Sequence, residues 1–115
     1  MNLTYINHLL DYEKPLSGLY IVPTPIGNLS DITIRSLKTL LSVDLIISED
    51  TRVTKKLTTK FGIQCKMQPF HKFNSKNKIP DIIKKINSNL SIALTTDSGT
   101  PIISDPGADL VKNCL

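Results

Sequence analysis

Short apolar runs alternate with longer stretches of helical spacing along the chain from Leu19 onward. The short runs, three of them rich in β-branched or aromatic residues, predict strands at residues 19–22, 44–48, 66–70 and 91–96. In the segments between them, apolar side chains recur every three to four residues, which predicts amphipathic helices. These helical stripes are Ile34, Leu37 and Leu41; then Val53, Leu57 and Phe61; then Ile79, Ile82, Ile83 and Ile86.

Residues that commonly begin or end helices stand at the ends of these stripes. Asp31 and Asp50 are expected to cap the first two helices, and Gly62 follows the second stripe. Pro80 fits the opening turn of the third helix, and Asp105 with the proline after it is expected to begin a fourth. The resulting β-α-β-α-β-α-β-α order predicts an α/β fold, with a mostly parallel sheet and helices on both faces.

Length and composition favour a single globular domain. A chain of 115 residues accommodates one modest core, and 40% hydrophobic with 21% charged residues is typical of proteins that fold in water. We expect residues 1–18 to form a polar N-terminal extension and residues 19–115 to form the α/β domain. No apolar run approaches the roughly 18 residues of a membrane span, and the N-terminus lacks signal-peptide features. These observations predict a cytoplasmic protein without a membrane partner.

The net charge and the two cysteines give limited information about binding partners, metal sites and disulfides. The formal net charge of +4 is compatible with an anionic partner without requiring one. Cys65 and Cys114 are far apart and form no CxxC pattern, so reduced thiols are favoured over a metal site or a disulfide. Cys65 is expected at a strand edge and Cys114 on the inner face of a helix.

Ligands of parallel sheets bind beyond the carboxyl ends of the strands, so the loops after the strands are the candidate site. The first loop, PTPIGN, carries Pro23 and Pro25, which fix φ and remove two backbone donors, while Gly27 permits a positive φ. With so few N–H groups, this loop suits a flat, largely neutral ligand better than a phosphate. A rigid strand-to-helix connection explains the same residues equally well.

The loop after the fourth strand, DSGTPIISDPG, can place several polar groups together. Asp97, Ser98 and Gly99 offer a carboxylate, a hydroxyl and bare backbone, and Thr100 with Pro101 fixes the exit of the chain. A carboxylate at this position could pair with an amine or a ribose hydroxyl of a ligand. An Asx-turn made by Asp97 is the alternative.

The loop after the second strand, EDTR, concentrates charge where a helix begins. Asp50 is explained as the helix N-cap. Glu49 and Arg52 are then free to face a ligand, Glu49 orienting a hydroxyl and Arg52 holding a phosphate. A salt bridge between Glu49 and Arg52 is the alternative.

Basic and aromatic residues follow in the next helix and in the third loop, HKFNSKNK. Such a surface suits RNA, although solvated lysine faces are commoner. The residues concerned are Lys55, Lys56, Lys60, Phe70, His71, Lys72, Phe73, Lys76 and Lys78.

Three motifs together carry a family resemblance: LYIVPTPIGNLSDITIRSL, DLIISEDTR and DSGTPIISDPG, in this order. They resemble the N-terminal domain of the ribosomal RNA methyltransferases within the tetrapyrrole methylase superfamily, and the likeness covers residues 19–115. The resemblance implies S-adenosylmethionine as cofactor, 16S rRNA or the small ribosomal subunit as partner, and methylation of a cytidine ribose 2′-hydroxyl. It also implies a homodimer and no metal.

The resemblance further implies roles for the loop residues. Pro25 and Gly27 would lie near S-adenosylmethionine, and a second wall of the cofactor site would be formed by Asp97, Ser98, Gly99, Thr100 and Pro101. The residues expected to face the RNA or the reacting ribose are Glu49, Asp50 and Arg52.

The resemblance also indicates what lies beyond the matched part. Full members continue into another strand and then a second α/β domain, so we expect this sequence to be truncated before its last strand and to lack that domain. It would then be either the N-terminal half of an active enzyme or an inactive remnant with weak RNA binding. A methyltransferase of porphyrin-like substrates is disfavoured by EDTR and the lysine-rich third loop.

Overall fold

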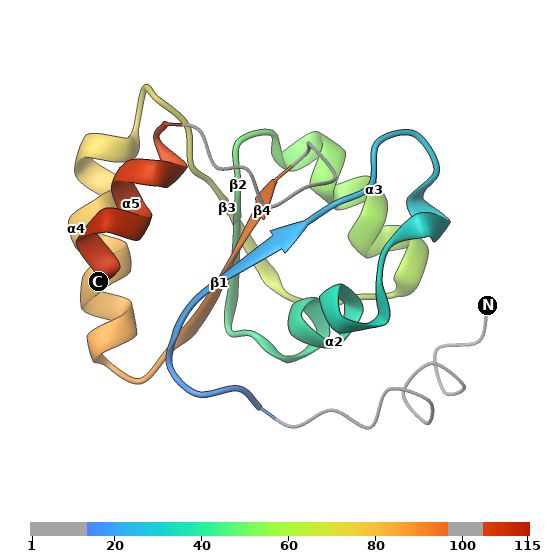
Figure 1. The fold of residues 1–115 in the computed structure, drawn as a ribbon, viewed down its shortest axis with the longest axis horizontal. Helices are drawn as coiled ribbons and strands as arrows, with labels where there is room; N and C mark the ends of the chain where they lie inside the picture. The colour runs from blue at the N-terminus through green and yellow to red at the C-terminus, as the bar shows by residue number, and fades with distance from the viewer. Residues whose placement is uncertain (1–13, 97–104) are drawn as a thin grey trace.

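The computed structural model describes residues 14–96 and 105–115, which form a parallel sheet between two layers of helices (Figure 1). The strands are β1 (Gly18–Pro23), β2 (Leu45–Ser48), β3 (Lys66–Pro69) and β4 (Ser91–Thr96), in the spatial order β1-β4-β2-β3. The α-helices are α2 (Ile34–Ser42), α3 (Thr51–Phe61), α4 (Ser75–Asn87) and α5 (Gly107–Cys114), and a 3-10 helix spans Leu29–Asp31. All neighbouring strands run parallel, so the predicted α/β fold is confirmed.

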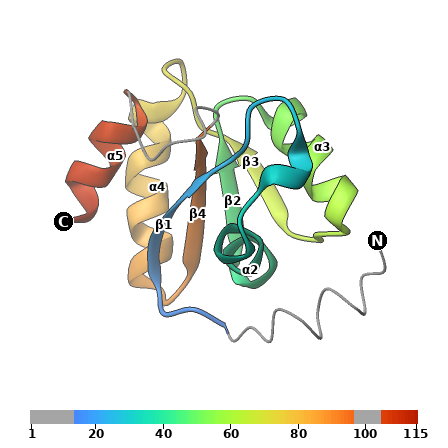
Figure 2. The same cartoon turned by 45° about the vertical axis from the view of Figure 1, so that its right-hand side comes forward.

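The helices are divided between the two faces of the sheet, α2 and α3 on one and α4 and α5 on the other (Figure 2). Side chains of a strand point alternately to its two faces, and the two cores follow this alternation. Ile46 and Ala93 pack under α2 and α3, whereas Ile47 and Leu94 pack under α4 and α5. The central strands β2 and β4 are thus buried on both sides, which explains their nearly continuous apolar sequences.

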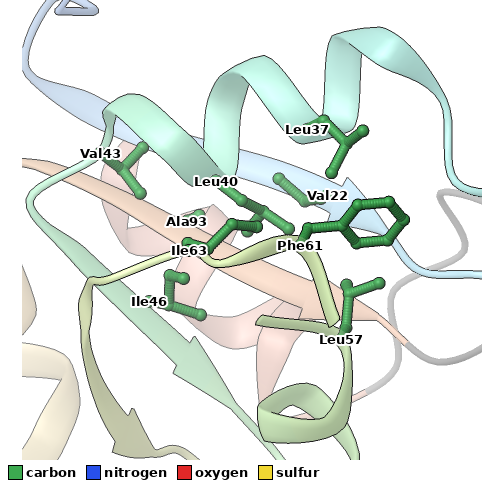
Figure 3. Packing of buried hydrophobic residues seen from close by; sticks show 9 residues of the cluster. All are labelled: Val22, Leu37, Leu40, Val43, Ile46, Leu57, Phe61, Ile63 and Ala93. Atoms are coloured by element: carbon green, nitrogen blue, oxygen red, sulfur yellow. The ribbon is translucent and has the colours of Figure 1, made fainter. Parts of the chain in front are cut away.

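The core beneath α2 and α3 holds that side of the domain together (Figure 3). Leu40 from α2 and Leu57 from α3 are almost fully buried, and Phe61 lies beside Leu57 on α3. They cover Val22 of β1. Burial of side chains of this size stabilises a fold by roughly 1.5–3 kcal/mol each, so this core fixes where β1, β2 and α3 stand relative to one another.

The predicted ends of α3 are confirmed. Asp50 Oδ1 accepts a hydrogen bond from the Arg52 N–H at 3.0 Å, as an N-cap does. Gly62 follows the last helical residue with φ 66°, a left-handed conformation that glycine adopts without strain.

The prediction that Asp31 caps α2 is wrong. Asp31 lies in the 3-10 helix, and Thr33 is the N-cap, with Thr33 Oγ1 accepting from the Ser36 N–H at 3.1 Å. Aspartate and threonine can both cap a helix. Because the 3-10 helix includes Asp31, the cap of α2 falls on Thr33 instead. Similarly, α5 begins after Pro106, and Asp105 is not its cap.

The prediction for the third helix is wrong at its start. We expected Pro80 in the opening turn, but α4 begins at Ser75 and contains Pro80 in its interior. The first turn is polar and carries no apolar stripe, so the sequence pattern did not reveal it. Pro80 is exposed, which keeps its ring at the solvent side of the helix.

The two cysteines differ from one another in exposure. Cys65 is half-buried just before the edge strand β3, with its Sγ 3.4 Å from the Val43 carbonyl oxygen, and burial raises the pKa of its thiol. The prediction that Cys114 lies on the inner face of a helix is wrong, because it is exposed at the end of α5. Leu110, one turn earlier, occupies the buried position instead.

Candidate functional site

The carboxyl ends of the four strands meet at one edge of the sheet, where the predicted functional loops begin. Pro23 of β1 is paired with Thr96 of β4, and Ser48 of β2 is paired with both Thr95 of β4 and Pro69 of β3. The end of β4 therefore lies between the loop after β1 and the loop after β2. Order along the chain reverses at this position, which is where parallel sheets bind ligands.

The loop after β1 is fastened to the end of β4. The Thr24 N–H and the Thr24 hydroxyl both donate to the Thr96 carbonyl oxygen, each at 2.8 Å, and Thr24 is buried. Beyond this anchor the loop becomes exposed: Ile26 is 73% exposed, and Gly27 has φ 85°. A Cβ at Gly27 would meet no atom within 4 Å, so the positive φ, not lack of space, explains glycine here.

The second predicted cofactor segment lies outside the described residues. Its members are Asp97, Ser98, Gly99, Thr100 and Pro101. They follow β4 directly in the sequence. Because β4 pairs with β1 and its last carbonyl is bound by the loop after β1, the two predicted cofactor segments leave the sheet from adjacent strands.

The turn between β2 and α3 carries Glu49, Asp50 and Arg52. The Arg52 guanidinium donates to both carboxylate oxygens of Asp50, from Nε and from Nη2, at 3.2 Å each. Arg52 thus pairs with Asp50, not with Glu49 as the sequence alternative had it. The pairing lowers the pKa of Asp50 and raises that of Arg52. Glu49 is exposed, and within the described ranges its carboxylate has no partner.

The Arg52 side chain remains accessible despite this ion pair. It is 88% exposed, and the fork with Asp50 uses only two of its N–H donors. The other donors can therefore bind a further anion. Asp50, by contrast, is held by the Arg52 backbone and side chain together, which fits a structural role better than proton transfer.

Beneath this turn lies a chain of buried hydroxyls that the sequence analysis missed. The Ser48 hydroxyl donates to the Asp50 carbonyl oxygen at 3.0 Å and lies 2.7 Å from Thr54 Oγ1. Thr54 Oγ1 in turn lies 3.2 Å from Thr95 Oγ1. Since the proton of Ser48 is used toward Asp50, Thr54 donates to Ser48. The network links the charged turn to the end of β4.

The loop after β3 is ordered by its own polar side chains. His71 Nδ1 accepts from the Phe73 N–H at 3.2 Å, and the Asn74 side chain bonds both the His71 N–H and the Pro69 carbonyl. Phe73 is 85% exposed, with the Lys72 ammonium 5.1 Å from its ring centroid. Phe70, which we grouped with this aromatic surface, is 2% exposed and belongs to the core.

Residues 14–96 and 105–115 contain no group of three or more His, Cys, Asp or Glu side chains arranged to hold a metal ion. Within the same residues, no helix combines the length and the apolar character needed to cross a membrane.

The sequence matches the family of tetrapyrrole (corrin/porphyrin) methylases over residues 18–115. It is 55% identical over 96 residues to a protein of Vibrio cholerae named ribosomal RNA small subunit methyltransferase I, covering 84% of this chain and 33% of the relative. A Streptococcus pyogenes protein of the same name is 54% identical over 104 residues, covering 90% and 36%.

An Escherichia coli relative, again named ribosomal RNA small subunit methyltransferase I, is 50% identical over 96 residues, which are 84% of this chain and 34% of the relative. The chain thus spans about a third of the length of these curated relatives. The family match covers all four strands and the loops after them. The chain therefore belongs to the tetrapyrrole methylase family.

Proposed function

We propose that this chain is the N-terminal part of an S-adenosylmethionine-dependent methyltransferase that modifies the RNA of the small ribosomal subunit. One observation carries the proposal: the two loops predicted to bind the cofactor leave adjacent strands, and Thr24 fastens the first loop to the end of β4. The charged turn after β2 stands on the other side of β4. Cofactor and RNA groups would then meet over the end of β4.

The chemistry of the first loop fits this cofactor. S-adenosylmethionine carries no phosphate, so it does not need the array of N–H donors that a proline-bracketed loop lacks. Ile26 and Gly27 give an exposed apolar surface with open space, against which a flat adenosine could lie. When bound, the cofactor supplies the electrophilic methyl group. We propose that Pro25 and Gly27 bind one side of it, with Ser98, Gly99, Thr100 and Pro101 on the other.

Asp97 has a separate role in this proposal. It immediately follows the last residue of β4 in the sequence, and β4 pairs with β1. A carboxylate there would hold the amine or a ribose hydroxyl of the cofactor, since charge-assisted hydrogen bonds are the stronger ones.

We further propose that the methyl acceptor is a cytidine ribose 2′-hydroxyl. Transfer converts the hydroxyl to a methyl ether, so its proton must leave to a base or to water. Glu49 is the better placed carboxylate for orienting that hydroxyl, because it is exposed while Asp50 is held by Arg52. Arg52 would bind a neighbouring phosphate with its remaining donors.

The experiment is a calorimetric titration of the chain with S-adenosylmethionine, alone and with the C-terminal part of the Vibrio cholerae relative added. We expect binding to appear when the added part is present, and transfer of a labelled methyl group to small-subunit rRNA in the same mixture. Asp97→Ala is expected to weaken cofactor binding. Asp109→Ala, which removes an exposed carboxylate of α5, serves as the control.

Two outcomes would contradict the proposal. Absence of cofactor binding in both mixtures, from a chain whose circular dichroism shows it folded, would favour the inactive remnant. Binding of the cofactor with methyl transfer to small molecules only would exclude RNA as the substrate.

A further inference from the structure

Positive charge is distributed unevenly along the chain. Residues 51–80 contain 8 of the 14 Lys and Arg residues and none of the 10 Asp and Glu residues. The cations of this segment are Arg52, Lys55, Lys56, Lys60, Lys66, Lys72, Lys76 and Lys78. The rest of the chain therefore holds all of the acidic residues, and the modest net charge of +4 hides a strongly basic region.

The structure gathers half of these cations on the outward face of α3. Arg52, Lys55, Lys56 and Lys60 line a shallow depression of about 590 Å³, together with Thr59. All five are exposed, while Leu57 on the opposite side of the helix is buried in the core. The depression begins at the charged turn after β2, because Arg52 belongs to both.

The basic region continues around the edge strand β3. Lys66, the first residue of β3, is exposed, and β3 has β2 as its neighbour on one side only in the described sheet. Lys78 Nζ donates to Gln68 Oε1 at 2.8 Å, which brings the start of α4 against the same strand. Cations of α3 and α4 thus lie on the two faces of the sheet that meet at the edge strand carrying Lys66.

Two lysines elsewhere in the described part of the chain have acidic partners, whereas no lysine of α3 has one within the described residues. Lys85 pairs with Asp81 at 2.7 Å and Lys14 pairs with Asp44 at 3.2 Å. On α3, Lys56 and Lys60 stand four residues apart, a spacing at which like charges repel by roughly 0.2–0.5 kcal/mol. The unpaired charge therefore disfavours the isolated helix, and an anionic partner would offset this cost.

We infer that the outward face of α3 binds the phosphodiester backbone of the RNA, extending the contact that begins at Arg52. The inference rests on the proposed function, which supplies RNA as the substrate class. Lysine ammonium groups on flexible stems suit backbone phosphates, which require positive charge without fixed geometry. The α3 face positions the RNA in this arrangement, and the loops at the end of β4 carry out the chemistry.

The test compares two double variants with equal loss of charge. Lys56→Gln/Lys60→Gln removes two cations from the α3 face, and Lys84→Gln/Lys112→Gln removes two exposed cations from α4 and α5 on the opposite layer. Binding of a fluorescein-labelled fragment of small-subunit rRNA is measured by anisotropy over a range of salt concentrations. Titration with S-adenosylmethionine in the presence of the added C-terminal part is run on the same samples.

We expect the α3 variant to bind RNA about tenfold or more weakly at low salt, with the slope of log affinity against log salt reduced by about 1.4, for two lost single-strand phosphate contacts. The control variant should keep the slope of the parent chain. Cofactor binding should be the same in all three proteins. Loss of cofactor binding would therefore count against the proposed function, whereas equal RNA binding by the variants would count against the role of α3 alone.

Equal effects of the two variants would overturn the inference, because net charge alone would then explain the attraction. It would also be overturned if the parent chain bound vesicles of anionic phospholipid but not RNA.

Discussion

The two ends of the sheet both carry polar clusters, yet they use charge in opposite ways. At the amino end, the Asp44 carboxylate accepts from the Ser91 N–H at 2.9 Å and from the Ser91 hydroxyl at 3.1 Å, and it pairs with Lys14. At the carboxyl end, the buried groups are the neutral hydroxyls of Thr54 and its neighbours, and the charged side chains stand outside them. Unlike the Asp44 cluster, the cluster at the carboxyl end leaves its charged side chains exposed to a ligand.

The difference follows from the physical cost of burying charge. The Asp44 carboxylate stabilises the start of two strands, and most of its acceptor positions are occupied by the Ser91 N–H, the Ser91 hydroxyl and Lys14. Hydroxyls both donate and accept, so Ser48, Thr54 and Thr95 can fill a buried space without an ion. They support the turn from below and leave Glu49 and Arg52 exposed above it.

The largest effect is expected when the amino-end cluster is broken. Asp44→Ala removes the acceptor of two hydrogen bonds that join β2 to β4, and it leaves the N–H of Ser91, a buried residue, without this partner. Hydrogen bonds to charged groups contribute roughly 1.5–3 kcal/mol, so we expect the free energy of unfolding to fall by about 2 kcal/mol. Urea denaturation measures this change. If the urea midpoint were unchanged, water would be replacing the Asp44 carboxylate as hydrogen-bond acceptor without loss of stability.

A smaller effect is expected at the carboxyl end. Thr54→Val keeps the shape of the side chain but removes its hydroxyl, while Ser48 still donates to Asp50 and Thr95 still lies 3.5 Å from the Ile47 carbonyl. We expect a loss of about 1 kcal/mol in the same denaturation experiment. The all-apolar variant Ser48→Ala/Thr54→Val/Thr95→Val should be less destabilised than the sum of its single substitutions, because hydroxyls that would each lose a partner are removed together. Simple additivity would contradict the network.

The pH dependence of stability should also report on the cluster at the amino end. Hydrogen bonding to the Ser91 backbone, with Lys14 and the Ser91 hydroxyl, lowers the pKa of Asp44 below its ordinary value of 3.8. A depressed carboxyl pKa stabilises the fold above the unfolded pKa, and this contribution is lost as pH falls through the folded pKa. The stability difference between the parent chain and Asp44→Asn should therefore shrink below about pH 4. A difference that stays constant from pH 6 to pH 3 would exclude this role.

Most of the fold could be predicted because apolar periodicity depends only on which side chains are buried. The strand predicted at 91–96 agrees with β4, and the predicted cap Asp50 is found in place. The start of α4 was not predicted, because its first turn is polar and lies before the apolar stripe that marked the helix in the sequence. The partner of Arg52 could not be predicted, because Glu49 and Asp50 are both within reach along the sequence and only the direction of the turn decides. The hydroxyl network has no sequence signal other than polar residues at strand ends.

The smallest effect on stability, and the sharpest on function, is expected at Arg52. Its side chain is 88% exposed and its ion pair with Asp50 lies in water, where such pairs contribute little. Arg52→Gln should therefore leave the urea midpoint unchanged, whereas RNA binding should weaken and cofactor binding should not. Glu49→Gln is the matched variant: it should lower the rate of methyl transfer while RNA affinity is kept, since it removes the carboxylate proposed to orient the hydroxyl but no cation. If Arg52→Gln instead abolished cofactor binding with RNA affinity unchanged, the turn after β2 would belong to the cofactor site, and the assignment of the two loops flanking β4 would have to be exchanged.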